Sequence, residues 1–318
     1  MSNAFIFPGQ GSQKIGMASA FVNGFKTGME VMEEIEDAIS FKLSKLIEEG
    51  SIEDLTKTEN AQPALFAVSI MIVKILEKEY GYDIKKNCKY LAGHSLGEYT
   101  ALCASGVFSL SDTAKLVRFR GELMANAFPN REECSMMALI GVSADDIEDL
   151  IKKYQDGENL CVIANDNSNT QVVVSGTRIG VKVFVEEAKE KLKIIKAIEL
   201  NTSGPFHSPL MAKASIAFDK KLSSDFSPSN FEVPVIMNVS AKPLSNKDEV
   251  KEYMIRQITS RVRWRESMQL LVDDPSVEKI IEIGSGKVLS NMLKRSFPEV
   301  NSFNLETVAQ IEEFVKSE

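Results

Sequence analysis

A serine flanked by small residues is the first feature of this sequence that could do chemistry. Gly93-His94-Ser95-Leu96-Gly97 fits the pattern G-x-S-x-G, between a predicted strand at 90–92 and a predicted helix at 96–105. In that setting the pattern is typical of a nucleophile elbow, a tight turn that holds a serine above the edge of a sheet. The start of the following helix supplies free backbone N–H groups for a developing oxyanion. We therefore expect Ser95 to be a nucleophile in acyl transfer.

A serine hydroxyl needs a general base, and the chain contains only two histidines, His94 and His207. His94 directly precedes the serine, and neighbours in a tight turn project in different directions, so His94 is poorly placed to take the proton. His207 lies in the uncharged, proline-containing segment Ser203–Pro209, between a predicted strand and a predicted helix. By elimination His207 is the predicted base, and we expect His94 to pack or to make a supporting hydrogen bond.

The composition is that of a globular protein that can bury a core. Of its 318 residues 44% are hydrophobic and 26% are charged, and the net charge of −8 disfavours a nucleic-acid partner. The longest uncharged run, Asn60–Val73, is shorter than the roughly 20 apolar residues of a membrane helix. The N-terminal stretch lacks the basic flank of a signal peptide. We therefore expect no membrane partner.

The four cysteines are far apart and form no C-x-x-C pair. This spacing argues against a zinc site and against a disulfide framework. Cysteines used in this way are typical of a reducing compartment. We therefore expect a cytoplasmic protein without a bound metal.

The elements that must position the serine follow an alternating order of strands and helices, which predicts an α/β fold with a parallel sheet. Between residues 131 and 200 the predicted order changes to βαββαβ, the pattern of a ferredoxin-like domain. We therefore expect an α/β hydrolase-like catalytic domain at 1–130 and 201–318, with a small ferredoxin-like domain inserted at 131–200. Helical periodicity extends over 16–57, and a last helix is expected from Leu305.

Six motifs follow one another along the chain: Phe7-Pro8-Gly9-Gln10-Gly11-Ser12-Gln13, Gly93-His94-Ser95-Leu96-Gly97-Glu98, Arg120-Gly121-Glu122-Leu123-Met124, Gln171-Val172-Val173-Val174-Ser175-Gly176, Gly204-Pro205-Phe206-His207-Ser208 and Glu282-Ile283-Gly284-Ser285-Gly286-Lys287-Val288-Leu289. In type and order they resemble those of the malonyl-CoA:acyl carrier protein transacylase family. The resemblance covers essentially the whole chain, including the predicted insertion. Ser285 departs from the family, which often has proline there.

The resemblance implies that Ser95 takes a malonyl group from malonyl-CoA and passes it to the phosphopantetheine thiol of acyl carrier protein, in fatty acid biosynthesis. The coenzyme A thioester is then a substrate, and no cofactor is implied. The backbone N–H groups of Gln10 and Leu96 would form the oxyanion hole. The family orients its histidine with a main-chain carbonyl, which falls here on Gln257.

The resemblance also assigns Arg120 to the malonyl carboxylate, because a guanidinium can pair with a carboxylate through two hydrogen bonds. Helical spacing alone leaves this assignment open, since Arg118 and Arg120 border one apolar helix face on opposite sides. Phe206, which precedes the histidine, resembles family members that accept malonyl rather than branched acyl groups.

A basic cluster surrounds Trp264 and consists of Arg261, Arg263 and Arg265. We expect it to be a solvated surface. Its charge could also attract an acidic carrier protein or the phosphates of coenzyme A.

Three other functions stay open. A stand-alone acyltransferase of a polyketide pathway would share every motif. A serine hydrolase that removes acyl groups from carriers is disfavoured by Arg120, because an uncharged acyl chain would leave a buried guanidinium unpaired. A non-catalytic carrier-binding protein is disfavoured by the pair Ser95 and His207.

Overall fold

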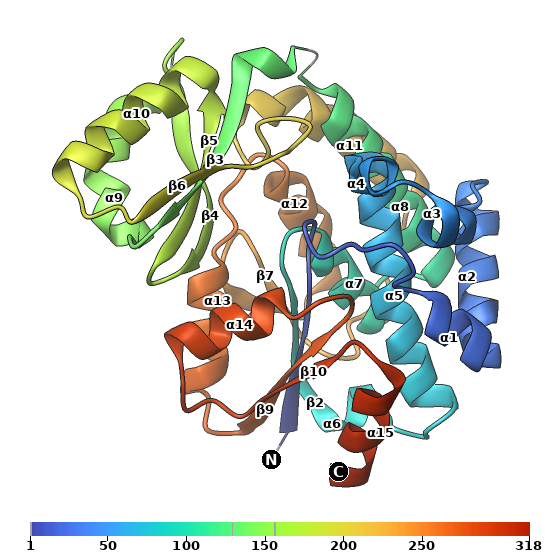
Figure 1. Ribbon diagram of the computed structural model, residues 1–318. Coiled ribbons are helices and arrows are strands. Elements are labelled where there is room, and N and C mark those ends of the chain that lie inside the picture. The colour runs from blue at the N-terminus through green and yellow to red at the C-terminus, as the bar shows by residue number, and fades with distance from the viewer. Residues whose placement is uncertain (1, 129, 156) are drawn as a thin grey trace.

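The computed structural model describes residues 2–128, 130–155 and 157–318, which form two sheets of different kinds (Figure 1). The larger sheet has the strand order β10-β9-β1-β2-β7-β8. Neighbouring strands in it are parallel, except that β8 runs antiparallel to β7. Its strands are β1 (Ser2–Phe7), β2 (Cys88–Gly93), β7 (Val235–Met237), β8 (Lys242–Leu244), β9 (Val277–Ile283) and β10 (Ser302–Leu305).

Helices cover both faces of this sheet, because its central strands carry apolar side chains on both sides. In β1, Phe5 and Phe7 belong to the large core, whereas Ala4 and Ile6 belong to a smaller core that includes Trp264. The helices around the sheet are α1 (Ser19–Gly24), α2 (Lys26–Ile39), α3 (Leu43–Glu49), α4 (Ile52–Thr56), α5 (Thr58–Lys78), α6 (Ile84–Asn87), α7 (Leu96–Ala104), α8 (Leu110–Asn126), α11 (Ala212–Asp225), α12 (Lys247–Gln257), α13 (Trp264–Asp273), α14 (Val288–Ser296) and α15 (Val308–Ser317).

The smaller sheet is antiparallel and has the strand order β4-β5-β3-β6. It is built from β3 (Cys134–Ile140), α9 (Ala144–Ile151), β4 (Cys161–Ser168), β5 (Gln171–Thr177), α10 (Arg178–Lys191) and β6 (Lys196–Glu199). This order of elements is the predicted βαββαβ pattern, and the fold class expected from the sequence is confirmed. The residue limits of the inserted domain, 131 and 200, stay a prediction.

The small sheet is apolar on both faces. Leu139 and Val174 pack against α9 and α10 in a core of their own. Met136, Ala138 and Val173 face the other way and join the core of the large sheet. One face of the small sheet is therefore turned toward the large sheet, and this face forms a wall of the space between the two sheets.

Two details of the sequence prediction are wrong. Strand β8 was not expected, and β10 occupies Ser302–Leu305, so the last helix begins at Val308 rather than at Leu305. These strands have only three and four residues, too few to show a period in the sequence. The region with helical periodicity over 16–57 contains four separate helices, α1 to α4.

Helix α5 is long and apolar enough to cross a membrane by length and composition, and it is the one helix of the described chain of which this is true. It packs against α2 and α8, and 83% of its most apolar window is buried inside the protein. A buried core helix passes the same test, so the length and composition of α5 are explained by its place in the core.

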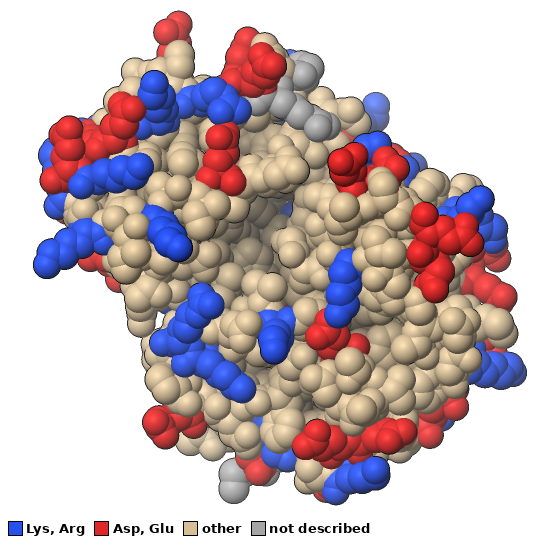
Figure 2. All heavy atoms as spheres, in the orientation of Figure 1, with Lys and Arg blue, Asp and Glu red and all other residues tan. Residues whose placement is uncertain are grey.

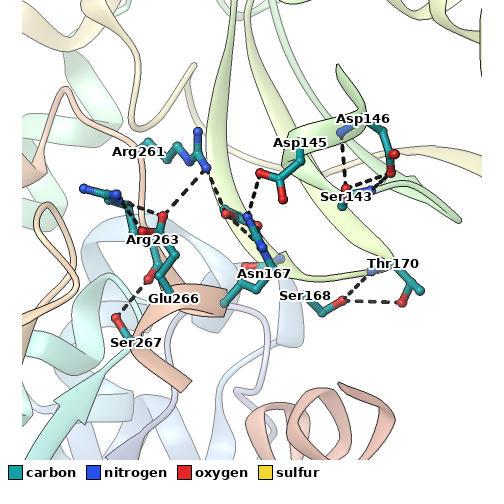
Figure 3. Close-up of polar contacts among 12 residues, drawn as sticks. Ser143, Asp145, Asp146, Asn167, Ser168, Thr170, Arg261, Arg263, Glu266 and Ser267 are labelled. Atoms are coloured by element: carbon teal, nitrogen blue, oxygen red, sulfur yellow. Dashed lines mark hydrogen bonds and ion pairs between the residues drawn. The ribbon is translucent and has the colours of Figure 1, made fainter. Parts of the chain in front are cut away.

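A cluster of ion pairs around the buried Asp166 joins the small sheet to α13 and to the segment just before it (Figure 3). Asp166 on β4 is fully buried and accepts from Arg261 at 2.9 Å and from Arg265 at 3.0 Å. The same two arginines pair at 3.0 Å with Glu148 and Asp145 respectively, both on α9. The expectation of a solvated surface is therefore wrong for Arg261 and Arg265, whose guanidinium groups bind carboxylates of the small-sheet unit. The third arginine of the cluster, Arg263, has a side chain that is 41% exposed and pairs with Glu266 of α13.

Asp166→Asn should destabilise the protein, because it keeps the shape of the side chain but removes the charge that two guanidinium groups share. Loss of one partner from a buried ion pair leads us to expect a decrease of roughly 3–5 kcal/mol in the free energy of unfolding. Asp145→Asn is the matched control, since its side chain is 73% exposed and should cost less than about 1 kcal/mol. Urea denaturation of both variants measures the difference, and equal losses would contradict a special role for Asp166.

Candidate active site

Ser95 occupies a sharp turn between β2 and α7. Its backbone has φ 51° and ψ −103°, a conformation that L-residues rarely adopt. The flanking glycines are required by close approach: a Cβ at Gly93 would lie 1.8 Å from the carbonyl carbon of Gly97, and a Cβ at Gly97 would lie 2.1 Å from the oxygen of Phe7. The structure therefore has the strand–turn–helix geometry that the motif predicts, with the serine at its apex.

His207 lies beside the serine, although the two are far apart in the sequence. Ser95 Oγ is 2.8 Å from His207 Nε2, and His207 Nδ1 is 2.9 Å from the backbone oxygen of Gln257. A carbonyl can only accept, so Nδ1 carries the proton and Nε2 offers its lone pair to the serine hydroxyl. The pair is thus arranged for proton transfer from Ser95 to His207, with Gln257 fixing the tautomer.

Arg120 reaches the same place from α8. It is 1% exposed, and its guanidinium donates to Gln62 Oε1 at 2.8 Å, to Gln257 Oε1 at 3.0 Å and to Ser95 Oγ at 3.0 Å. No carboxylate within the described residues forms an ion pair with it. Its hydrogen-bond acceptors are uncharged, so a buried positive charge stands next to the serine without a counter-ion.

Arg118, which periodicity could not distinguish from Arg120, points elsewhere. It pairs with Glu122 at 2.7 Å, and it donates to the backbone oxygen of Glu59 and to Asn60 Oδ1, each at 2.9 Å. Arg118 therefore stabilises the start of α5, and only Arg120 of the two lies at the serine.

The predicted oxyanion donors, Gln10 and Leu96, line the same cavity as Ser95. Within the described chain neither backbone N–H makes a hydrogen bond. The Gln10 side chain donates to Thr58 Oγ1 at 3.3 Å, on the first turn of α5. Both N–H groups are therefore free to bind an oxyanion.

The cavity has a volume of about 250 Å³ and lies between the two sheets. Figure 2 shows the surface hollowed there, between the small-sheet unit and the rest of the molecule. Met136 of β3 and Phe206 line it with apolar surface, whereas Ser95, Arg120 and His207 provide its polar groups. The cavity thus combines an apolar wall, a nucleophile and a cation.

Burial controls the charges in the site. Burial and the neighbouring Arg120 guanidinium lower the pKa of His207 to about 3, so the imidazole is neutral at neutral pH. Burial raises the pKa of Glu98, on the first turn of α7, to about 8. At neutral pH Glu98 is therefore mostly protonated, and it leaves the charge of Arg120 uncompensated.

His94 does not bond to Ser95 Oγ. Its Nε2 is 2.8 Å from Asn167 Oδ1 of β4, and its ring packs edge-to-face on Trp264 with centroids 5.4 Å apart. Burial also lowers the pKa of His94. This arrangement is the packing and supporting hydrogen bond that the sequence favoured for His94.

Four side-chain contributions were missed by the sequence analysis: those of Gln62, Glu98, Asn238 and the Gln257 carboxamide. Gln62 and Gln257 hold Arg120, and Asn238 contacts the turn at Ser95. None of the four had a usable signal in the sequence: Asn238, for example, falls inside the strand predicted at 235–239, whereas β7 ends at Met237. Within the described residues no group of three or more His, Cys, Asp and Glu is placed to hold a metal, and the four cysteines are buried and form no disulfide.

A serine on an elbow beside a neutral histidine is the arrangement of enzymes that work through an acyl-serine intermediate. Comparison with known proteins narrows this class. The acyl transferase domain family matches residues 4–312. A malonyl CoA-acyl carrier protein transacylase of Bacillus subtilis (strain 168) is 42% identical over 293 residues, which cover 92% of this chain and 89% of the relative. A protein of the same name from Staphylococcus aureus (strain MRSA252) is 35% identical over 311 residues, 97% of this chain and 96% of the relative.

This chain belongs to the acyl transferase domain family, among its malonyl CoA-acyl carrier protein transacylases. Solved structures support the same family membership. An acyl-carrier-protein S-malonyltransferase from Bartonella henselae superimposes with a TM-score of 0.94 at 42% identity, covering 100% of this chain and 99% of the other. A malonyl-transacylase in complex with a type II polyketide acyl carrier protein gives a TM-score of 0.93 at 29% identity, with complete coverage of both chains.

Glu98→Gln should make stability less dependent on pH. In the native state Glu98 keeps its proton up to about pH 8, whereas the unfolded carboxyl loses it near pH 4.5. Wild-type stability should therefore fall as pH rises between these values, by on the order of 1.4 kcal/mol per pH unit from this group. Urea denaturation between pH 5.5 and pH 8.5, where that window is sampled, should show a smaller decrease in the variant.

Glu36→Gln is the matched control, because the pKa of Glu36 is shifted in the opposite direction to that of Glu98. Glu36 is also buried, which raises its pKa, but hydrogen bonds from Lys42 and Ser44 outweigh burial and lower it. Its stabilising contribution is therefore present above the unfolded pKa and is lost as pH falls. Parallel pH dependences for the two variants would contradict the assignment of a protonated Glu98.

Proposed function

We propose that this chain transfers the malonyl group of malonyl-CoA to the phosphopantetheine thiol of acyl carrier protein, for fatty acid biosynthesis, through an acyl-enzyme on Ser95. The observation that carries the proposal is the buried Arg120 guanidinium, 3.0 Å from Ser95 Oγ and without a carboxylate partner among the described residues. An acyl group that ends in a carboxylate would supply the missing charge through a bidentate pair. Malonyl is such a group.

The first half-reaction forms the acyl-enzyme. His207 Nε2 takes the proton of Ser95 as Oγ attacks the thioester carbon, and the carbonyl oxygen becomes an oxyanion bound by the N–H groups of Gln10 and Leu96. The carbon–sulfur bond then breaks, and the coenzyme A sulfur leaves with the proton from His207. The backbone carbonyl of Gln257 stabilises the imidazolium that forms between these steps.

The second half-reaction runs the same steps toward a different thiol. His207 takes the proton of the phosphopantetheine thiol, and the sulfur attacks the malonyl ester on Ser95. The ester bond breaks, and Ser95 Oγ recovers its proton from His207. Because one histidine serves both halves, its neutral state at neutral pH suits it to begin each half as a base.

The proposal also covers the acceptor carrier protein, the other partners and the cellular compartment. A structural relative binds a type II polyketide acyl carrier protein, so a polyketide carrier is the second candidate acceptor. We propose that neither nucleic acid nor membrane is a partner, since the net charge is −8 and the one membrane-length helix of the described chain is a core helix. We propose that the enzyme is cytoplasmic, because its four cysteines form no disulfide and a reducing compartment would keep them so.

Covalent labelling tests the proposed function directly. Incubation of wild-type protein with malonyl-CoA should add one malonyl group in the intact mass, and holo acyl carrier protein should then remove it. Ser95→Ala should abolish the label, and loss of such a nucleophile lowers kcat by on the order of a millionfold. A label that persists in Ser95→Ala, or none in the wild type, would refute this mechanism.

Arg120→Ala should change which acyl group is transferred. A hydrogen bond to a charged group contributes about 1.5–3 kcal/mol, so kcat/KM for malonyl-CoA should fall by roughly 10- to 150-fold. Acetyl-CoA has no carboxylate and strands the guanidinium in the wild type, so its transfer should hold steady or rise. Arg118→Ala is the matched control, because its guanidinium lies outside the site. An unchanged ratio of the two kcat/KM values in Arg120→Ala would remove Arg120 from substrate selection.

A further inference from the structure

The turn at Ser95 leaves backbone groups that the sheet and the helix cannot satisfy. Strand β2 ends at Gly93, and α7 begins at Leu96. Between them His94 N–H still donates to the oxygen of Phe7 in β1, but Ser95 N–H has no backbone partner in the sheet or in the helix. The positive φ of Ser95 adds strain, and a conformation of this kind persists only where its surroundings over-determine it. Something outside the turn must therefore hold it.

One side chain, that of Asn238, closes the turn from both ends. Ser95 N–H donates to Asn238 Oδ1 at 2.8 Å, and Asn238 Nδ2 donates to the backbone oxygen of Gly93 at 2.7 Å. Asn238 is fully buried and directly follows β7, which pairs with β2 through Leu91 and Ala92. Parallel pairing thus delivers its carboxamide to the end of β2.

Asn238 is itself fixed by three neighbours. Its backbone N–H donates to Glu98 Oε2 at 2.5 Å, and its backbone oxygen accepts from Arg263 N–H at 2.9 Å. Gln257 Nε2 donates to the backbone oxygen of Ser95 at 2.9 Å and approaches Asn238 Oδ1 at 3.3 Å. The carboxamide therefore has one orientation, with its oxygen toward Ser95 N–H.

This arrangement decides which N–H group faces the substrate. In the first turn of α7, Gly97 N–H donates to the oxygen of His94 and Glu98 N–H donates to the oxygen of Ser95. Ser95 N–H is taken by Asn238. Of residues 95–98, all within the described chain, only Leu96 keeps a free N–H.

We propose that Asn238 is a positioning residue for acyl transfer: its carboxamide binds both ends of the Ser95 turn, aims Oγ at His207 and leaves Leu96 N–H as the oxyanion donor. The inference rests on the proposed function and deepens it. Asn238 touches neither substrate nor the reacting atoms, so it acts on the acylation step through Ser95. Its loss should lower kcat and leave the affinity for malonyl-CoA nearly unchanged.

Asn238→Ala and Ser105→Ala form the first test. Ser105 is an equally buried side chain at the other end of α7; it donates to the backbone oxygen of Val233 and accepts from the Val233 N–H. Misplacement of a reacting group by about 1 Å costs on the order of 100-fold. We expect Asn238→Ala to lose about that factor in kcat with KM within threefold of the wild type, and Ser105→Ala to keep wild-type kcat. Thermal denaturation should show similar losses of Tm.

Asn238→Asp keeps the size of the side chain and gives a second readout. A protonated carboxyl can accept from Ser95 N–H and donate to Gly93 O, whereas an ionised carboxylate has no donor for Gly93. The ratio of variant to wild-type kcat should therefore rise as pH falls from 9 to 6. Of the facing groups, Arg120 and His207 keep one charge state over this range. Glu98 has a pKa of about 8 and would be coupled to a carboxyl at position 238, so the ratio is measured with Glu98→Gln present in both proteins. A purely structural role would lower kcat by the same factor at every pH.

The outcomes separate the two proposals. If wild-type protein is not malonylated, the proposed function fails. If the wild type is malonylated but Asn238→Ala has the kcat of Ser105→Ala, the positioning role fails while the function stands. If Asn238→Ala does not fold, the pH dependence of Asn238→Asp decides, and a flat ratio overturns the role.

Discussion

The backbone of Ser95 is the constraint on which the rest of the site depends. A serine at positive φ between a strand and a helix points its hydroxyl away from both, but the conformation requires that nothing crowd the turn. Gly93 and Gly97 leave the necessary space, and Gly97 does so against the carbonyl of Phe7 at the end of β1. The next residues after β1 lead to Gln10, which lines the same cavity as Ser95. Close packing of β1 against the turn thus brings Gln10 and Leu96, the proposed oxyanion donors, to the cavity that holds Ser95.

A second constraint is the uncompensated charge of Arg120. A carboxylate that oriented His207 would lie close to this guanidinium and pair with it, which would remove the charge that an anionic acyl group needs. The backbone carbonyl of Gln257 orients the imidazole without adding charge, and the Gln257 side chain holds Arg120 with a neutral oxygen. Protonation of the buried Glu98 serves the same end. The site is therefore built from neutral acceptors around one cation.

The sequence predicted best what depends on local chain geometry. The elbow has a short motif with a defined context, and the count of histidines left one candidate base, so Ser95 and His207 could be proposed before the fold was known. The Gln257 carbonyl could not, because every residue has a carbonyl and only the resemblance selected this one. Helical periodicity could not distinguish Arg118 from Arg120, because the difference between them lies in the residues outside α8 that each guanidinium contacts.

Other features were out of reach because their partners lie far away in the chain. The arginines at 261 and 265 look like surface charge until β4 brings Asp166 between them. Asn238 looks like the end of a strand until β7 pairs with β2. Short edge strands such as β10 carry too few residues for a period. Long-range pairing, rather than residue type, determines each of these contacts.

The hydrogen bonds that connect the two sheets also explain why the cavity can have a fixed shape. Val262 bonds to β4 in both directions: its N–H donates to the oxygen of Ala164, and its oxygen accepts from Asp166 N–H. The next residue, Arg263, donates its N–H to the backbone oxygen of Asn238. One two-residue segment therefore holds both the wall of the cavity and the side chain that fixes the nucleophile. The distance between the small-sheet wall of the cavity and Ser95 is thus set by the hydrogen bonds of this short segment, and the ion pairs of the buried Asp166 hold the wall against it.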